Sequence, residues 1–72
     1  MNLGRIKELI MDKDKYVMLK AIVPQKETVS IGMIKNLLNV STDEAEEMLN
    51  NLIQEGMVEA YSMDGTNFLV RK

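Results

Sequence analysis

Residues 39–56 read NVSTDEAEEMLNNLIQEG and predict one strongly amphipathic helix. Ser41-Thr42-Asp43-Glu44 forms a capping box, in which the Ser41 hydroxyl accepts from the Glu44 amide while the Glu44 carboxylate reaches back. Gly56 stands where a left-handed residue ends a helix. The apolar stripe between these signals has the spacing i, i+3, i+4, i+7, i+8 and consists of Ala45, Met48, Leu49, Leu52 and Ile53.

Two helices are predicted at the start of the chain. The first covers Leu3 to Met11, with an apolar side of Leu3, Ile6 and Ile10. The second covers roughly Lys15 to Val23 and could be capped by Asp14. It ends at Val23, because Pro24 disfavours helical geometry at the residue before it. Its apolar side is predicted to hold Met18, Ala21 and Ile22, and the methionines Met18, Met33 and Met48 are expected to fill gaps in the core.

A short extended segment, Thr28 to Ser30, precedes a third helix from Ile31 to about Asn39, with Ser30 as its cap. Ile31, Ile34 and Leu38 lie on one side of this helix and should face the stripe of the helix that follows.

The C-terminal residues predict a hairpin. Val58 to Met63 and Thr66 to Arg71 are strand-like, and Asp64-Gly65 between them favours a tight type I′ turn. That turn would place Tyr61 opposite Phe68 and Ala60 opposite Leu69.

The order helix, helix, short strand, helix, turn, helix, hairpin resembles the winged helix-turn-helix family. The segment TVSIGMIKNLLNVSTDEAEEMLNNLIQEGMVEAYSMDGTNFLVRK, residues 28–72, carries the likeness. The resemblance implies an α+β, mainly α fold: a three-helix core, a short strand and a C-terminal β-hairpin wing. It covers residues 15–72 as a winged-helix domain and leaves residues 1–14 as an additional N-terminal helix.

Composition excludes several classes of function. Without Cys there are no disulfides or thiolate metal sites, and without His or Cys the usual catalytic nucleophile and base are missing, so we expect no enzyme and no cofactor. Asp43 and Glu47 are neighbours on a helix, but they lack the loop spacing of an oxygen-ligand cage, and we expect no metal. The N-terminus has no apolar run long enough for a signal peptide or a membrane span, so a cytoplasmic protein is expected.

Charge is unevenly distributed along the chain. Residues 1–40 hold seven basic and four acidic residues, a net charge of +3, whereas residues 41–72 hold two basic and seven acidic residues, a net charge of −5. Two oppositely charged halves favour oriented docking to a partner.

The resemblance implies that the helix after Ser41 corresponds to the recognition helix, whose outer face lies in the DNA major groove in family members that read DNA. The residues of that outer face are here Thr42, Asp43, Glu44, Glu46, Glu47 and Asn50. DNA would repel such a face, because DNA binders displace counterions with Lys and Arg. The wing tip also lacks Lys and Arg. The first hypothesis is therefore an interaction module, of the kind found in scaffold subunits of the proteasome-lid and initiation-factor type, whose partner-binding face is Thr42, Asp43, Glu46, Glu47, Asn50 and Met63.

The alternative hypothesis is a small DNA-binding transcriptional regulator that holds the duplex with its basic N-terminal half. Its phosphate contacts would be Lys15, Lys26, Lys35, Arg71 and Lys72. Under either hypothesis the protein could form a homodimer through Leu3, Ile6 and Ile10, because winged-helix proteins often dimerise through added helices.

Overall fold

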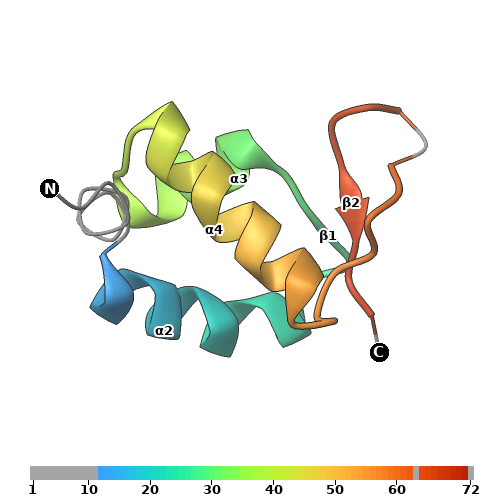
Figure 1. The fold of residues 1–72 in the computed structure, drawn as a ribbon, viewed down its shortest axis with the longest axis horizontal. Helices are drawn as coiled ribbons and strands as arrows, with labels where there is room; N and C mark the ends of the chain where they lie inside the picture. The colour runs from blue at the N-terminus through green and yellow to red at the C-terminus, as the bar shows by residue number, and fades with distance from the viewer. Residues whose placement is uncertain (1–11, 63, 72) are drawn as a thin grey trace, which may run out of the picture.

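The computed structural model describes residues 12–62 and 64–71. Its elements, in chain order, are α2 (Lys13–Ile22), the 3-10 turn η1 (Val23–Gln25), β1 (Thr28–Val29), α3 (Ile31–Leu38), α4 (Thr42–Gln54) and β2 (Phe68–Leu69). The three helices gather at one side of the molecule, and the small sheet lies at the other with the wing, the loop whose described residues are 59–62 and 64–67 (Figure 1). This arrangement confirms the predicted winged-helix fold. The predicted helix over Leu3 to Met11 lies outside the described residues.

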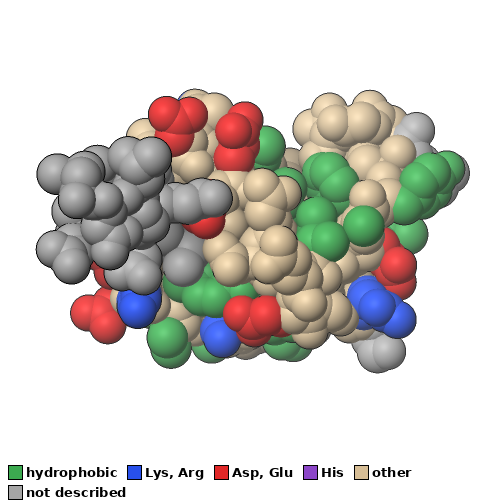
Figure 2. Space-filling model, viewed as in Figure 1, with side chains coloured by type: hydrophobic (Ala, Val, Ile, Leu, Met, Phe, Trp, Pro, Cys, Tyr) green, Lys and Arg blue, Asp and Glu red, His purple; other side chains and the backbone are tan. Residues whose placement is uncertain are grey.

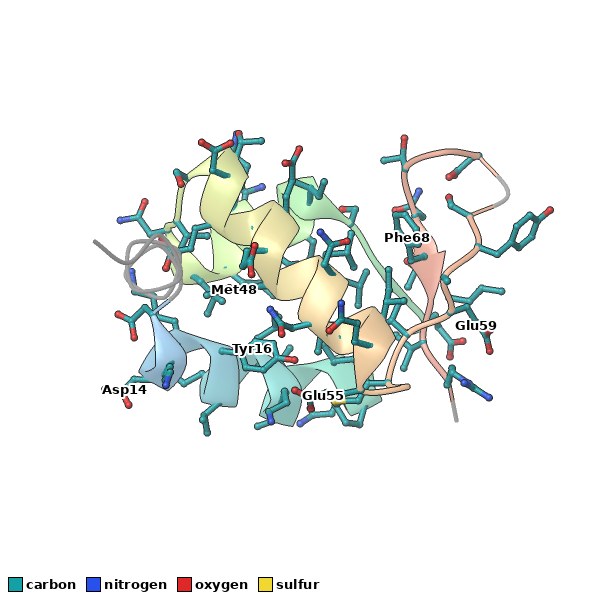
Figure 3. The ribbon with its side chains drawn as sticks, viewed as in Figure 1. Asp14, Tyr16, Met48, Glu55, Glu59 and Phe68 are labelled. Atoms are coloured by element: carbon teal, nitrogen blue, oxygen red, sulfur yellow. The ribbon has the colours of Figure 1, made fainter. Side chains whose placement is uncertain are left out.

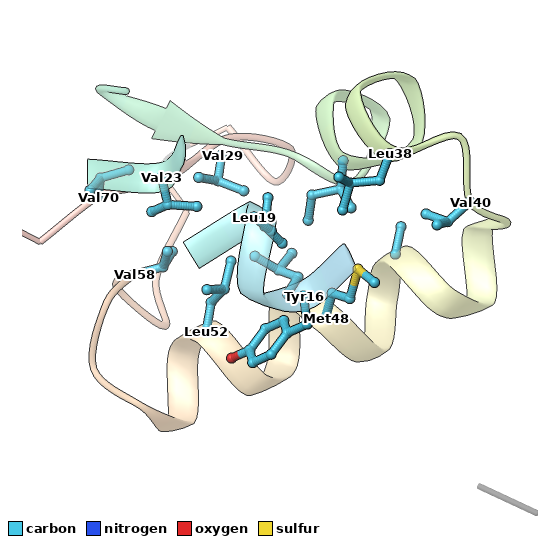
Figure 4. Close-up of a cluster of buried hydrophobic side chains, with 13 residues drawn as sticks. Tyr16, Leu19, Val23, Val29, Leu38, Val40, Met48, Leu52, Val58 and Val70 are labelled. Atoms are coloured by element: carbon cyan, nitrogen blue, oxygen red, sulfur yellow. The ribbon is translucent and has the colours of Figure 1, made fainter. Parts of the chain in front are cut away.

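The core forms where α2, α3 and α4 meet the sheet (Figure 4). The apolar stripe of α4 faces this core as predicted: Ala45, Met48, Leu49 and Leu52 are buried, and Ile53 packs against them. Ile34 and Leu38 of α3 are also buried, with Ile31 packed at the edge. The remaining buried side chains are Tyr16, Leu19, Val23, Val29, Val40, Val58 and Val70.

The predicted capping signals of α3 and the end signal of α4 are confirmed. The Ser30 hydroxyl accepts from the Met33 amide at 3.1 Å, and α3 ends at Leu38, one residue before the predicted limit. Asn39 then takes a left-handed conformation with φ of 56°. Gly56 does the same after α4, with φ of 81°. Short polar side chains and glycine therefore fix these boundaries locally.

The capping box at the start of α4 is only half correct. The Ser41 hydroxyl accepts from the Glu44 amide at 3.2 Å, as predicted. The Glu44 carboxylate does not reach back along its own helix; it accepts instead from the Asp12 amide at 2.8 Å. Asp12 precedes α2, so this hydrogen bond joins the beginnings of two helices.

The prediction for α2 was wrong in its start and in its buried face. Asp12, not Asp14, caps the helix, because the Asp12 carboxylate accepts from the Asp14 amide at 2.9 Å. The buried residues are Tyr16 and Leu19, followed by Val23 of η1, rather than Met18, Ala21 and Ile22. Met18 is 56% exposed and fills no core gap. Tyr16 displaces it because its large ring can be buried once its hydroxyl has a partner.

The predicted hairpin register was also wrong. β2 pairs with β1 in an antiparallel ladder, with Thr28 opposite Leu69 and Val29 opposite Phe68. The other predicted strand is reduced to one bridge, between Val58 and Val70.

A two-residue turn at Asp64-Gly65 would have set Val58 opposite Arg71. Residues directly opposite share a face of the sheet, so that register would turn Arg71 toward the core. The observed bridge instead buries Val58 and Val70 together, at 1% and 7% exposure.

Candidate partner-binding surface

The exposed face of α4 is acidic. Thr42, Asp43, Glu46 and Asn50 are exposed and Glu47 is half-buried, and α4 contains no Lys or Arg. Acidic side chains lie over the beginning of α4, where this view shows no basic side chain, whereas acidic and basic side chains lie side by side over α2 and near the C-terminus (Figure 2). Asp43 and Glu44 in the first turn also stabilise the helix, because negative charge there opposes the positive end of the helix dipole. Met63, the other predicted member of this face, lies outside the described residues.

A groove lies between α4, the beginning of α3 and the wing. Its volume is about 590 Å³, and the molecular surface is hollowed between α4 and the wing (Figure 2). Phe68 lies on β2 and faces α4 from the wing side (Figure 3). The apolar lining consists of Ile31, Leu49, Ile53, Ala60 and Phe68, and the remaining lining consists of Gly32, Glu46, Asn50, Gly65 and Thr66.

Sequence reasoning missed this groove. Glu46 and Asn50 were predicted site residues, and the structure brings them to the groove. The other lining residues come from three separate segments, which no local pattern connects.

The wing is held in shape by one carboxylate. The Asp64 side chain accepts from the backbone amides of Thr66 and Asn67, each at 2.8 Å, and from the Asn67 side-chain amide at 3.0 Å. The Ser62 hydroxyl donates to the Asn67 carbonyl at 2.7 Å. The hydrogen bonds that Asp64 accepts, above all that from the Asn67 backbone amide, hold the pKa of Asp64 well below its usual range. The turn is not the predicted type I′ turn, because Asp64 lacks the positive φ that this type requires at both central residues.

A second polar cluster joins α2 to the end of α4 (Figure 3). The Tyr16 hydroxyl donates to Glu55 Oε2 at 2.8 Å, and Lys20 Nζ lies 3.3 Å from Glu55 Oε1. Burial raises the pKa of Tyr16, and its hydrogen bond to Glu55 raises the pKa further. The same hydrogen bond, together with Lys20, lowers the pKa of Glu55. We assign this cluster a structural role, because both carboxylate oxygens are already engaged within the domain.

The basic residues predicted to contact phosphate come from separate segments. Lys15 belongs to α2, Lys26 follows η1 and Lys35 belongs to α3. Arg71 Nε lies 3.2 Å from Glu59 Oε2, so its charge is partly neutralised. Lys72 lies outside the described residues.

Within residues 12–62 and 64–71, no three acidic side chains are placed to hold one metal ion. Within the same ranges, no helix combines the length and apolar character that crossing a bilayer requires.

The fold and this surface define a winged-helix domain. Comparison with protein-family models matches residues 7–70 to the PCI domain, and because this match covers most of the chain, the chain belongs to the PCI family. PCI domains have a winged-helix fold and are non-enzymatic protein–protein interaction modules of larger complexes. Comparisons with curated proteins and with solved structures gave no significant match. The resemblance seen in the sequence is therefore correct in fold, and the family is narrower than winged helices in general.

Proposed function

We propose that this PCI domain docks a protein partner through the exposed face of α4 and the wing. The observation that supports this proposal is the charge of that face, where Asp43 and Glu46 are exposed and no Lys or Arg of α4 accompanies them. The complete proposed surface is Thr42, Asp43, Glu46, Glu47, Asn50 and Met63.

The negative charge of this face favours a protein partner over DNA. Binding to a duplex gains most of its non-specific affinity when Lys and Arg displace phosphate counterions, which an acidic face cannot do. A protein partner with a basic surface would instead be steered toward this face and would associate faster. Membership of the PCI family also supports a protein partner, because these domains assemble with other proteins.

Two matched charge reversals test the proposal. Asp43 and Asp14 each occupy the second position of a helix, α4 and α2 respectively, and both are exposed. Asp43→Lys and Asp14→Lys therefore change the net charge equally and oppose a helix dipole at the same position. Only the first alters the proposed face.

The measurement is capture of partners by the tagged domain from native lysate, with and without nuclease treatment, read by quantitative mass spectrometry. We expect the proteins retained by the wild type to be retained by Asp14→Lys and lost by Asp43→Lys. Equal retention by both variants would contradict the proposal, as would capture that disappears when nucleic acid is digested.

A further inference from the structure

The groove beside α4 presents apolar surface that the domain itself does not cover. Ile31, Ile53 and Phe68 pack against the core on one side and remain partly exposed on the other. With a volume of about 590 Å³, the groove falls within the range of sites that bind ligands. Its walls come from helices and from a wing held by Asp64, so the groove exists before anything binds.

Gly32 keeps the α3 side of the groove open. It is exposed in the first turn of α3, and a Cβ atom added there would meet only Ser30 Oγ, at 4.0 Å. Gly32 also lacks the positive φ found at Gly56 and Gly65. A residue with a side chain can therefore stand at this position beside the groove without straining the backbone.

The charge beside the groove is negative. Glu46 lines it, and Asp43 lies one turn earlier on the same side of α4. No Lys or Arg is among the described residues that line the groove. The wing sequence, residues 59–67, also lacks both. A complementary occupant therefore places an apolar group in the groove and a positive charge against Glu46.

We infer that the groove seats a short apolar segment of a protein partner, with a Lys or Arg beside the apolar side chain to pair with Glu46. This inference rests on the proposed function of the α4 face and adds the chemistry of the segment that it binds. Burial of the apolar side chain supplies most of the affinity, and the basic side chain orients the segment and raises the association rate.

The experiment selects random short peptides displayed on phage against the wild-type domain and measures binding of the enriched, fluorescently labelled peptides by anisotropy. Gly32→Leu fills the groove without changing charge, and its control, Ala21→Leu, adds bulk on the exposed face of α2. Glu46→Lys reverses the charge at the groove, and its control is Asp14→Lys.

We expect the enriched peptides to combine apolar residues with Lys or Arg. Gly32→Leu should weaken their binding roughly tenfold, the loss that follows from one excluded anchor side chain. Glu46→Lys should also weaken binding and reduce its salt dependence, and both controls should bind like the wild type.

Three results would overturn the inference: no enriched class of peptide, enriched peptides that are acidic, or unchanged binding by Gly32→Leu. If binding depends on Glu46 but not on Gly32, the groove is excluded while the acidic docking face stands. If binding is indifferent to both, both proposals fail. Sedimentation that shows self-association of the wild type, abolished by Gly32→Leu, would assign the groove to a second copy of this chain instead.

Discussion

Glu55 contributes to stability in a pH-dependent way. Its pKa lies below the ordinary value of 4.5, because the Tyr16 hydroxyl donates to it and Lys20 pairs with it. A lowered pKa in the folded state means that ionised Glu55 stabilises the fold above the unfolded-state pKa. That contribution is lost as the pH falls through the folded-state value.

Glu55→Gln should therefore lower the melting temperature at neutral pH, and its difference from the wild type should shrink as the pH falls below about 4.5. Thermal unfolding followed by circular dichroism across this range measures the effect. Glu46→Gln, which neutralises an exposed carboxylate of α4, is the control and should give a small difference throughout. A constant gap between Glu55→Gln and the wild type at all pH values would refute the assignment.

Residue-level features differ in how readily the sequence reveals them. Ser30, Ser41 and Gly56 act on their immediate neighbours, so residue type and position were enough to predict their roles. The hydrogen bond between Tyr16 and Glu55 joins residues 39 positions apart. Nothing in either local sequence marks the pair.

Among the elements, α4 carries the largest share of the core. Leu52 of this helix is fully buried, and Leu52→Ala should reduce the free energy of unfolding by about 2–5 kcal/mol. Leu37 on α3 is 44% exposed, so Leu37→Ala is a matched control that should cost much less. Urea denaturation of both variants makes the comparison. Equal losses would show that the stripe of α4 does not form the core.

An element could be predicted where its buried apolar residues recur at a regular spacing along the sequence. Five apolar positions at helical spacing fixed both the existence and the buried face of α4. In α2 the same reasoning selected the wrong face, because Tyr16 was not counted among its apolar residues. In the wing, the Asp64 side chain accepts hydrogen bonds from the backbone amides of its own loop. The preference of Asp-Gly for type I′ turns does not take such side-chain hydrogen bonds into account.

At the scale of the whole molecule, the acidic surface and the groove lie side by side. The asymmetry of charge along the sequence corresponds to an acidic surface over α4, and the groove beside that surface combines α3, α4 and the wing. The acidic surface could be predicted from the sequence, because its carboxylates all belong to one helix, α4. The groove could not, because its shape depends on how the wing packs against two helices. The division into residues 1–14 and 15–72, and the homodimer through Leu3, Ile6 and Ile10, stay predictions.

The central claim is that the acidic face of α4 serves a protein partner and not a duplex. It is tested most directly by fluorescence anisotropy of a labelled DNA duplex in about 150 mM salt, where exposed charges are well screened. The wild type is compared with a variant that carries Asp43→Lys, Glu46→Lys and Glu47→Lys. Glu44 is kept, because its carboxylate accepts the Asp12 amide. We predict negligible binding by the wild type, and a gain of affinity with steep salt dependence in the variant. Tight binding by the wild type that the variant loses would contradict the claim, because the carboxylates themselves would then be contacting bases.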